Sequence, residues 1–227
     1  MMQPDYTSPD GRIKFYNCSY EELFKMGKTW DLAIVDPPYG IGITKNKRLN
    51  NNSKKDWDNE IPPPEYFEQI FRVSKNQIIW GGNYFIEHLK NSRCFINWDK
   101  LNHSDTYADC EMAWVSFDMN AKIIKYMWDG NRYGFEGNIK GVGKPTIRTH
   151  PTQKPIALYH WQLKNYAKPN ESIIDTHGGS MSHAIAVHDV NIALDMNLTL
   201  DICEIDTNYF NDAVKRFRTH IAQKQLF

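Results

Sequence analysis

The sequence predicts an α/β protein with a mostly parallel sheet covered by helices on both faces. Short apolar runs alternate with segments of helical spacing along the 227 residues, and this alternation is typical of such sheets. Hydrophobic residues make up 41% of the chain, which is enough for one core, so we expect a single domain over residues 1–227. Glycine or proline pairs follow several apolar runs, and ligands of parallel sheets bind at such strand ends.

The predicted strands and helices follow in chain order from this pattern. The apolar run at 31–35 ends at two prolines, and the run at 77–80 stops at Gly81-Gly82. Further strands are predicted at 94–98, 112–117, 122–128, 172–175 and 198–203. Helical spacing predicts helices at 64–74, 83–89, 155–166 (with Pro155 in the first turn), 180–188 and 208–224.

Composition excludes some classes of protein. No run of about 18 apolar residues occurs, so we expect no membrane-spanning segment. Residues 1–12 lack the apolar core of a secretory signal, which favours a cytoplasmic protein. The cysteines form no C-x-x-C pair, so we expect reduced thiols and no metal site. They are Cys18, Cys94, Cys110 and Cys203.

Basic residues are concentrated in two segments of a chain whose formal net charge is zero. Residues 44–55 and 119–154 hold twelve basic and two acidic residues, a net charge of +10. Basic patches on a neutral protein can bind phosphates, although such runs also occur in loops that only face water. The candidate phosphate contacts are Lys45, Lys47, Arg48, Lys54, Lys55, Lys144 and Arg148.

A glycine-containing turn links the predicted strand at 172–175 to the following helix. It reads Asp175-Thr-His-Gly-Gly-Ser180, and its glycines let a ligand approach the backbone at a helix N-terminus. Glu204 ends the next strand, where an acid commonly binds ribose hydroxyls. Because no G-x-G-x-x-G is present, we favour a single nucleoside over a dinucleotide. The alternative is a turn shaped by packing alone, with Glu204 on the surface.

A second candidate loop, Asp36-Pro37-Pro38-Tyr39, follows the strand at 31–35. The two prolines fix φ and lack N–H groups, so the backbone there offers carbonyl acceptors. A carboxylate beside a carbonyl suits an –NH₂ group, and an aromatic ring can stack on the base that carries it. An enzyme that acts on a base of a duplex must flip it out. The alternative is a turn that the prolines merely stiffen.

These motifs resemble those of amino-group DNA methyltransferases. Residues 36–39 resemble the catalytic tetrapeptide of that family, 175–180 its cofactor loop, and 150–155 the segment that precedes this loop. Their order resembles the beta group, and the chain is most similar to small enzymes of phages and prophages. Other segments that resemble the family are 13–23, 81–85 and 95–100. The resemblance implies the Rossmann-like fold of S-adenosylmethionine-dependent methyltransferases.

The resemblance implies methyl transfer from S-adenosylmethionine to the N6 amine of a flipped adenine in double-stranded DNA. Asp36 and a main-chain carbonyl of the Pro37-Pro38 pair would accept hydrogen bonds from the amine, and Tyr39 would stack on the adenine. The methyl group would move by direct displacement, which proximity favours. The chain has no Pro-Cys dipeptide, which argues against cytosine C5 methylation. Asp rather than Ser at position 36 favours adenine.

The resemblance also assigns residues to the cofactor. Glu204 would bind the ribose hydroxyls, and Lys154 is a suitable partner for the cofactor carboxylate. Thr176, His177 and Met181 depart from the usual Pro, Phe and Gly, so we expect His177 to pack against the cofactor. The cofactor set is Asn17, Cys18, His150, Thr152, Lys154, Asp175, His177, Gly178, Gly179, Ser180, Glu204, Ile205 and Asp206.

Two segments are predicted to contact DNA. Residues 44–60 form a long polar loop, which we expect to be mobile and to close over the flipped base. Residues 119–149 are predicted to form a small target-recognition segment, whose size leaves room for a homodimer. Three other functions remain open: an N4-cytosine methyltransferase, methylation of an RNA base or a protein amide, and a non-catalytic nucleic-acid-binding module. We expect a bacterial or phage-encoded protein.

Overall fold

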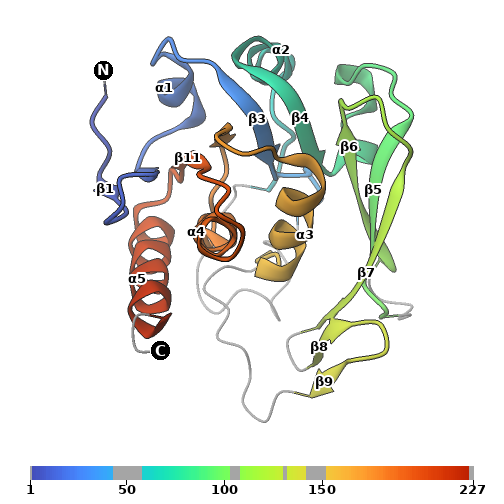
Figure 1. Cartoon of the computed structure of the whole chain (residues 1–227). Helices are drawn as coiled ribbons and strands as arrows, with labels where there is room; N and C mark the ends of the chain where they lie inside the picture. Colours follow the sequence, from blue (N-terminus) through green and yellow to red (C-terminus); the bar gives the residue numbers. More distant parts are fainter. Residues whose placement is uncertain (1, 43–57, 103–107, 130–131, 142–151, 225–227) are drawn as a thin grey trace.

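The computed structural model describes residues 2–42, 58–102, 108–129, 132–141 and 152–224. Figure 1 shows a sheet with helices on both sides. The strands are β1 (Tyr6–Thr7), β2 (Ile13–Tyr16), β3 (Trp30–Val35), β4 (Ser74–Trp80), β5 (Cys94–Asp99), β6 (Cys110–Val115), β7 (Lys122–Trp128), β8 (Arg132–Phe135), β9 (Lys140–Gly141), β10 (Ser172–Asp175) and β11 (Thr199–Cys203). The helices are α1 (Tyr20–Phe24), α2 (Pro64–Val73), α3 (Ile156–Tyr166), α4 (Ser182–Leu194) and α5 (Thr207–Lys224), with 3-10 turns η2 (Gly82–Tyr84) and η3 (Ile86–His88).

The described strands form one sheet in the order β1-β2-β11-β10-β3-β4-β6-β5-β7-β8-β9. Its five central strands, from β2 to β4, are parallel, as predicted. Beyond β4 the direction changes, because β6 pairs antiparallel with both β4 and β5. The sheet is therefore parallel at its centre and mixed toward β7.

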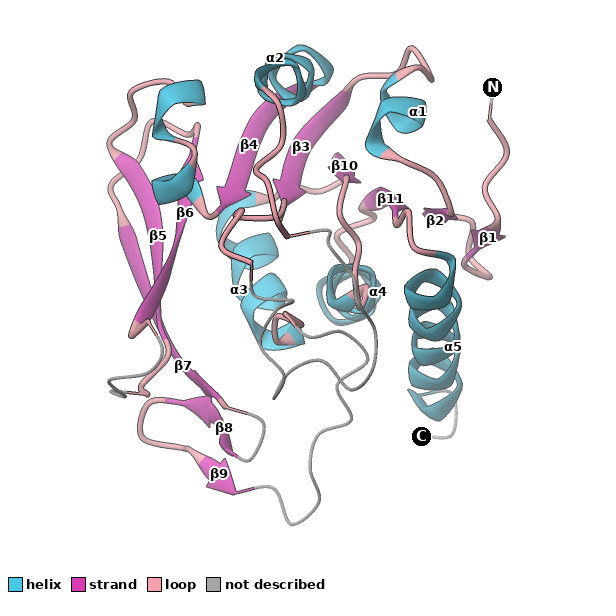
Figure 2. Cartoon of the chain, turned by 180° about the vertical axis from the view of Figure 1, so that it is seen from behind, coloured by secondary structure: helices cyan, strands magenta, loops and turns pink. Residues whose placement is uncertain are grey.

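Two layers of helices cover the central strands, one on each face (Figure 2). Along β3, Leu32 and Ile34 pack on the side of α3, α4 and α5, whereas Ala33 and Val35 pack on the side of α1 and α2. This alternation follows from the two-residue period of a strand. Because both faces are buried, β3 reads as a continuous apolar run, and each buried large aliphatic side chain contributes about 1.5–3 kcal/mol.

Part of the predicted target-recognition segment is an antiparallel extension of the sheet. Strand β8 pairs with β7, and β9 pairs with β8. Figure 2 shows these strands projecting past the end of α3. Residues 130–131 and 142–149 of that segment lie outside the described residues.

Most of the predicted elements are confirmed, several with changed boundaries, and one predicted helix is wrong. Strand β4 begins directly after α2, three residues earlier than predicted, because Ser74 leaves the helix in an extended conformation. The predicted helix 83–89 is instead the two turns η2 and η3. Helix α4 begins at Ser182 because Met181 has a positive φ of 53°. Among the described residues, no helix combines the length and apolarity needed to cross a membrane.

Candidate active site

The loops after β3, β10 and β11 border one cavity of about 440 Å³. Because β3, β10 and β11 are parallel neighbours, their carboxyl ends meet at one edge of the sheet. The predicted catalytic loop and the glycine turn therefore lie on the same side of the molecule. The lining residues are Asp36, Pro38, Thr152, Gln153, Lys154, Tyr159, His177, Gly178, Gly179, Ser180, Ser182, Glu204, Ile205, Asp206 and Tyr209.

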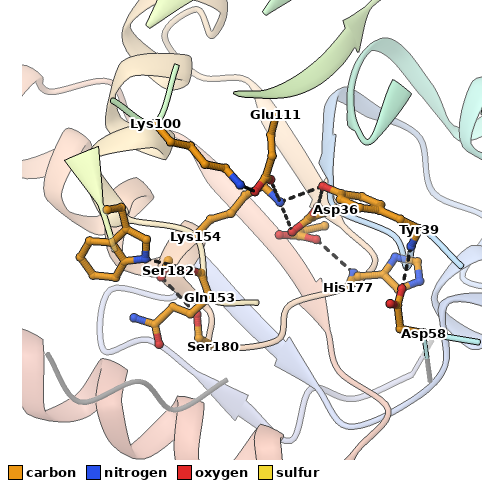
Figure 3. Close-up of polar contacts among 12 residues, drawn as sticks. Asp36, Tyr39, Asp58, Lys100, Glu111, Gln153, Lys154, His177, Ser180 and Ser182 are labelled. Atoms are coloured by element: carbon orange, nitrogen blue, oxygen red, sulfur yellow. Dashed lines mark hydrogen bonds and ion pairs between the residues drawn. The ribbon is translucent and has the colours of Figure 1, made fainter. Parts of the chain in front are cut away.

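The Asp36 carboxylate is held on both of its oxygens (Figure 3). The Tyr39 hydroxyl donates to Oδ1 at 2.7 Å, and the Lys154 ammonium lies 2.5 Å from Oδ2. The backbone N–H groups of Tyr39 and Gly40 both donate to Asp58 Oδ1, at 2.9 and 3.2 Å. This corner is therefore fixed both by its prolines and by a carboxylate that lies beyond the segment 43–57.

The Tyr39 ring packs against the residues that follow β4. It stacks on Tyr84, with 5.1 Å between ring centroids and 15° between planes. Phe85 packs edge-on against it at 6.1 Å. Gly81 allows this close packing, because a Cβ atom there would lie 2.3 Å from the Tyr39 ring.

Opposite charges alternate beside Asp36. Lys154 Nζ lies 3.3 Å from Glu111 Oε2, and Lys100 Nζ lies 2.7 Å from Glu111 Oε1. Burial raises the pKa of Asp36 above its usual value, and the Lys154 charge acts against that increase. Burial disfavours the charged form of Lys154, but Asp36 and Glu111 outweigh it and raise the pKa of Lys154. Lys154 was expected at the cofactor carboxylate, whereas its ammonium here contacts Asp36.

The glycine turn packs closely on the end of β11. Gly178 donates its N–H to the Cys203 carbonyl at 2.8 Å, and a Cβ at Gly178 would lie 3.0 Å from the Ile202 side chain. Asp175 fixes the start of the turn by accepting from the His177 N–H at 3.1 Å and by pairing with His183 Nδ1 at 3.0 Å. The turn therefore presents backbone, without side chains, to the cavity at its two glycines.

Glu204 joins the glycine turn to the loop after β11. Its Oε2 accepts from the Gly179 N–H at 2.9 Å, and its Oε1 accepts from the Asp206 N–H at 2.8 Å. Burial raises the pKa of Glu204 above its usual value. Ile205, 70% exposed, follows it on the cavity wall.

Asn17 supports this loop from the end of β2. Its side-chain amide donates to the Glu204 carbonyl at 2.8 Å, and its oxygen accepts from the Thr207 hydroxyl at 2.9 Å. Cys18 follows it in the chain, and its thiol interacts with that of Cys203. Neither residue lines the cavity, so both are placed behind the loop.

His177 forms part of the cavity wall as an uncharged aromatic ring. Burial lowers its pKa to about 4, and its Nδ1 pairs with Thr176 Oγ1 at 2.9 Å. Tyr20 and Tyr66 pack behind it, with ring centroids 5.7 and 5.5 Å away. The ring therefore packs on aromatic side chains and lines the cavity, and its contact with a cofactor stays a prediction.

Several predicted residues lie outside the described residues. They are His150 and the candidate DNA contacts Lys45, Lys47, Arg48, Lys54, Lys55, Lys144 and Arg148. Sequence reasoning missed Glu111 and Asp58, whose partners are distant in the chain, so no local spacing indicates them. Within the described ranges, no group of three or more His, Cys, Asp or Glu residues is arranged to hold a metal ion.

Solved structures share this architecture. M1.HpyAVI in complex with SAM is 20% identical, with a TM-score of 0.55 over 90% of this chain and 98% of that protein. The PvuII DNA methyltransferase (cytosine-N4-specific) is 11% identical, with a TM-score of 0.61 over 95% and 89%. A putative DNA modification methylase from Thermus thermophilus, complexed with S-adenosyl-L-methionine, is 12% identical, with a TM-score of 0.53 over 92% and 96%.

The sequence comparisons give no match. No protein-family model matches the chain, and no curated protein matches it. The structural likeness nevertheless covers nine-tenths or more of the chain. The chain therefore has the α/β Rossmann-like fold that the PvuII DNA methyltransferase also has.

Proposed function

We propose that this protein transfers a methyl group from S-adenosylmethionine to the N6 amine of an adenine in double-stranded DNA. The observation that carries this proposal is that the Asp36 corner and the Gly178-Gly179 turn line one cavity. One supplies acceptors for an amine, and the other supplies a backbone surface for a nucleoside. The structural neighbours, among them a DNA methyltransferase, support the same activity.

The cavity fits a nucleoside-sized cofactor. Its volume of about 440 Å³ lies within the usual range for ligand sites. Glu204 offers a carboxylate for ribose hydroxyls, and Ile205 offers an apolar surface for a base. The close packing behind Gly178 leaves no room for a Cβ, so the ligand would meet bare backbone there. S-adenosylmethionine, when bound, would supply a methyl group on a positively charged sulfur.

Asp36 and Tyr39 would bind the target base. The carboxylate of Asp36 has lone pairs beyond those that Tyr39 and Lys154 engage, and it would accept one amine N–H. The Pro37 carbonyl would accept the other, while the Tyr39 ring would stack on the base. These bonds would orient the nitrogen lone pair toward the methyl group. The proton that the nitrogen loses afterwards would find its nearest base in Asp36.

The second candidate is methylation of the N4 amine of cytosine. The similarity to the PvuII enzyme, which is specific for that amine, favours it, because the same acceptor pair would bind either base. Asp at position 36 is the feature that favours adenine.

Mass spectrometry of nucleosides from DNA incubated with the full-length protein and S-adenosylmethionine tests the proposal. We expect N6-methyladenine, whereas N4-methylcytosine would overturn the choice of base. Competition experiments with RNA and with protein test whether DNA is the preferred substrate. Asp36→Ala should abolish transfer while the Kd for S-adenosylmethionine stays near the wild-type value. Asp118→Ala is the matched control, because Asp118 is 90% exposed in a surface ion pair.

Glu204→Gln tests the cofactor site separately. Loss of a charged hydrogen bond costs about 1.5–3 kcal/mol, so the Kd for S-adenosylmethionine should rise about tenfold or more. Glu136→Gln is the control, since Glu136 pairs with Lys125 on the surface of β7 and β8. If calorimetry detects no cofactor binding by the wild-type protein, a non-catalytic nucleic-acid-binding module becomes the better interpretation.

A further inference from the structure

Lys154 is buried between the Asp36 carboxylate and a second carboxylate, that of Glu111. Its side chain is 5% exposed, and its ammonium lies 2.5 Å from Asp36 and 3.3 Å from Glu111. Strand β4 lies between β3 and β6, and β6 runs antiparallel to it. The beginning of β6, which carries Glu111, therefore lies near the corner that follows β3. Figure 3 shows Lys154 extending between the two carboxylates.

Two aromatic rings lie beside this buried ammonium. The rings of Trp80 and Tyr39 lie with their centroids 5.2 and 5.5 Å from Lys154 Nζ. The Tyr39 hydroxyl is 3.0 Å from the same nitrogen. A buried charge needs nearby charges of opposite sign. Here each charge has such a neighbour, because positive and negative groups alternate along the row Lys100, Glu111, Lys154 and Asp36.

We propose that Lys154 is a positioning residue whose ion pair keeps the Asp36 carboxylate ionised and oriented. Glu111, which is paired with Lys100, also attracts the Lys154 ammonium and so weakens the ion pair between Lys154 and Asp36. This inference rests on the proposed function, since Asp36 is taken to receive the target amine. It also gives Lys154 a different task from the contact with the cofactor carboxylate that the sequence suggested.

The charges predict opposite effects for the two partners. Burial raises the pKa of Asp36, Lys154 lowers it and Glu111 raises it. Among the residues that the structure describes, the other titratable groups near Asp36 are Tyr39, which donates a hydrogen bond to it, and Tyr159. Both phenols have raised pKa values through burial, so they stay neutral near pH 7. Removing Lys154 should therefore raise the pKa of Asp36, and removing the Glu111 charge should lower it.

Methyl transfer to DNA, measured against pH with the full-length protein, tests this inference. In Lys154→Met the acidic limb of kcat should move up by about 1 pH unit or more, while the Kd for S-adenosylmethionine stays near the wild-type value. In Glu111→Gln the limb should move down. Lys75→Met and Glu22→Gln are matched controls, because they remove charges from the exposed pairs Lys75–Asp31 and Lys25–Glu22.

Rescue and cofactor binding separate this role from a purely structural one. Lys154→Arg keeps the charge and should restore most of the pH profile. A tenfold or larger rise in the Kd of Lys154→Met, with an unshifted acidic limb, would overturn the inference in favour of a cofactor contact. If Lys154→Met does not fold, as judged by circular dichroism, the direction of the Glu111→Gln shift decides.

An NMR titration of the Asp36 carboxyl carbon makes the comparison without any activity. Opposite shifts of its pKa in Lys154→Met and Glu111→Gln support the inference, and unchanged values overturn it. If the two variants show these shifts but the wild-type protein methylates no DNA, the result contradicts only the proposed function.

Discussion

The Tyr39 ring occupies the space that a side chain at position 81 would need. Gly81 has a φ of +74°, and a Cβ built on it would lie 2.3 Å from the Tyr39 Cε1 atom. The turn that ends β4 therefore determines where the aromatic residue of the Asp-Pro-Pro-Tyr segment can lie. The glycine pair that ends this strand is thus also part of the candidate site.

Gly81→Ala should displace Tyr39 and reduce methyl transfer strongly. Gly27→Ala is the matched control, because Gly27 also has a positive φ, +66°, but a Cβ there would meet nothing within 4 Å. Both substitutions should lower the free energy of unfolding by about 1–2 kcal/mol, because alanine disfavours the left-handed backbone. Only Gly81→Ala should also reduce the methyl-transfer activity of the folded protein. Thermal unfolding and initial rates measure the two effects. Equal losses of activity would show that the contact with Tyr39 is unimportant.

Tyr39→Phe should keep most of the activity, and Tyr39→Ala should not. Phenylalanine keeps the ring on Tyr84 and removes the hydroxyl that contacts Asp36 and Lys154. Alanine removes the stacking surface, which is worth about 1–3 kcal/mol for a base, so kcat/KM should fall about fivefold to 150-fold. Steady-state kinetics on duplex DNA check this. A loss in Tyr39→Phe as large as in Tyr39→Ala would place the essential contribution in the hydroxyl.

His177 should make the fold less stable in mild acid. Burial lowers its pKa from 6.5 to about 4, so between these values the unfolded chain binds more protons than the folded one. The stability that neutral His177 contributes is present above about pH 6.5 and is lost as the pH falls toward 4, by up to about 2 kcal/mol given the partial exposure of the ring. His177→Phe should flatten this part of the curve in denaturant unfolding. An unchanged slope would contradict the prediction.

The basic segment 44–55 should set the salt dependence of DNA binding. Replacing Lys45, Lys47, Arg48, Lys54 and Lys55 with Gln should reduce the slope of log K against log salt by about 0.9 for each DNA phosphate that these side chains no longer neutralise. The Kd for S-adenosylmethionine should not change. Lys25→Gln and Lys75→Gln serve as controls, since these exposed lysines pair with Glu22 and Asp31. An unchanged slope in the fivefold variant would show that the segment only faces water.

Local patterns in the sequence determined the central fold and the two loops of the candidate site. Periodicity and strand-ending glycines or prolines are short-range signals, and they placed β3, β10 and β11 with Asp36, Gly178 and Glu204 at their ends. The short strands β8 and β9 carry no such signal. The antiparallel insertion of β6 also escaped prediction, because strand order depends on which apolar edges pair in space.

Only the tertiary structure decided which groups surround the Asp36 carboxylate. Lys154 stands in a recognisable segment, but its pairing with Asp36 and Glu111 depends on β6 lying beside β4 and on the chain before α3 crossing that edge. Charge pairing acts over a few ångströms in space and leaves no fixed spacing along the chain. The role proposed for Asp36 therefore rests on a pattern of four residues, whereas its electrostatic environment is set by the whole sheet.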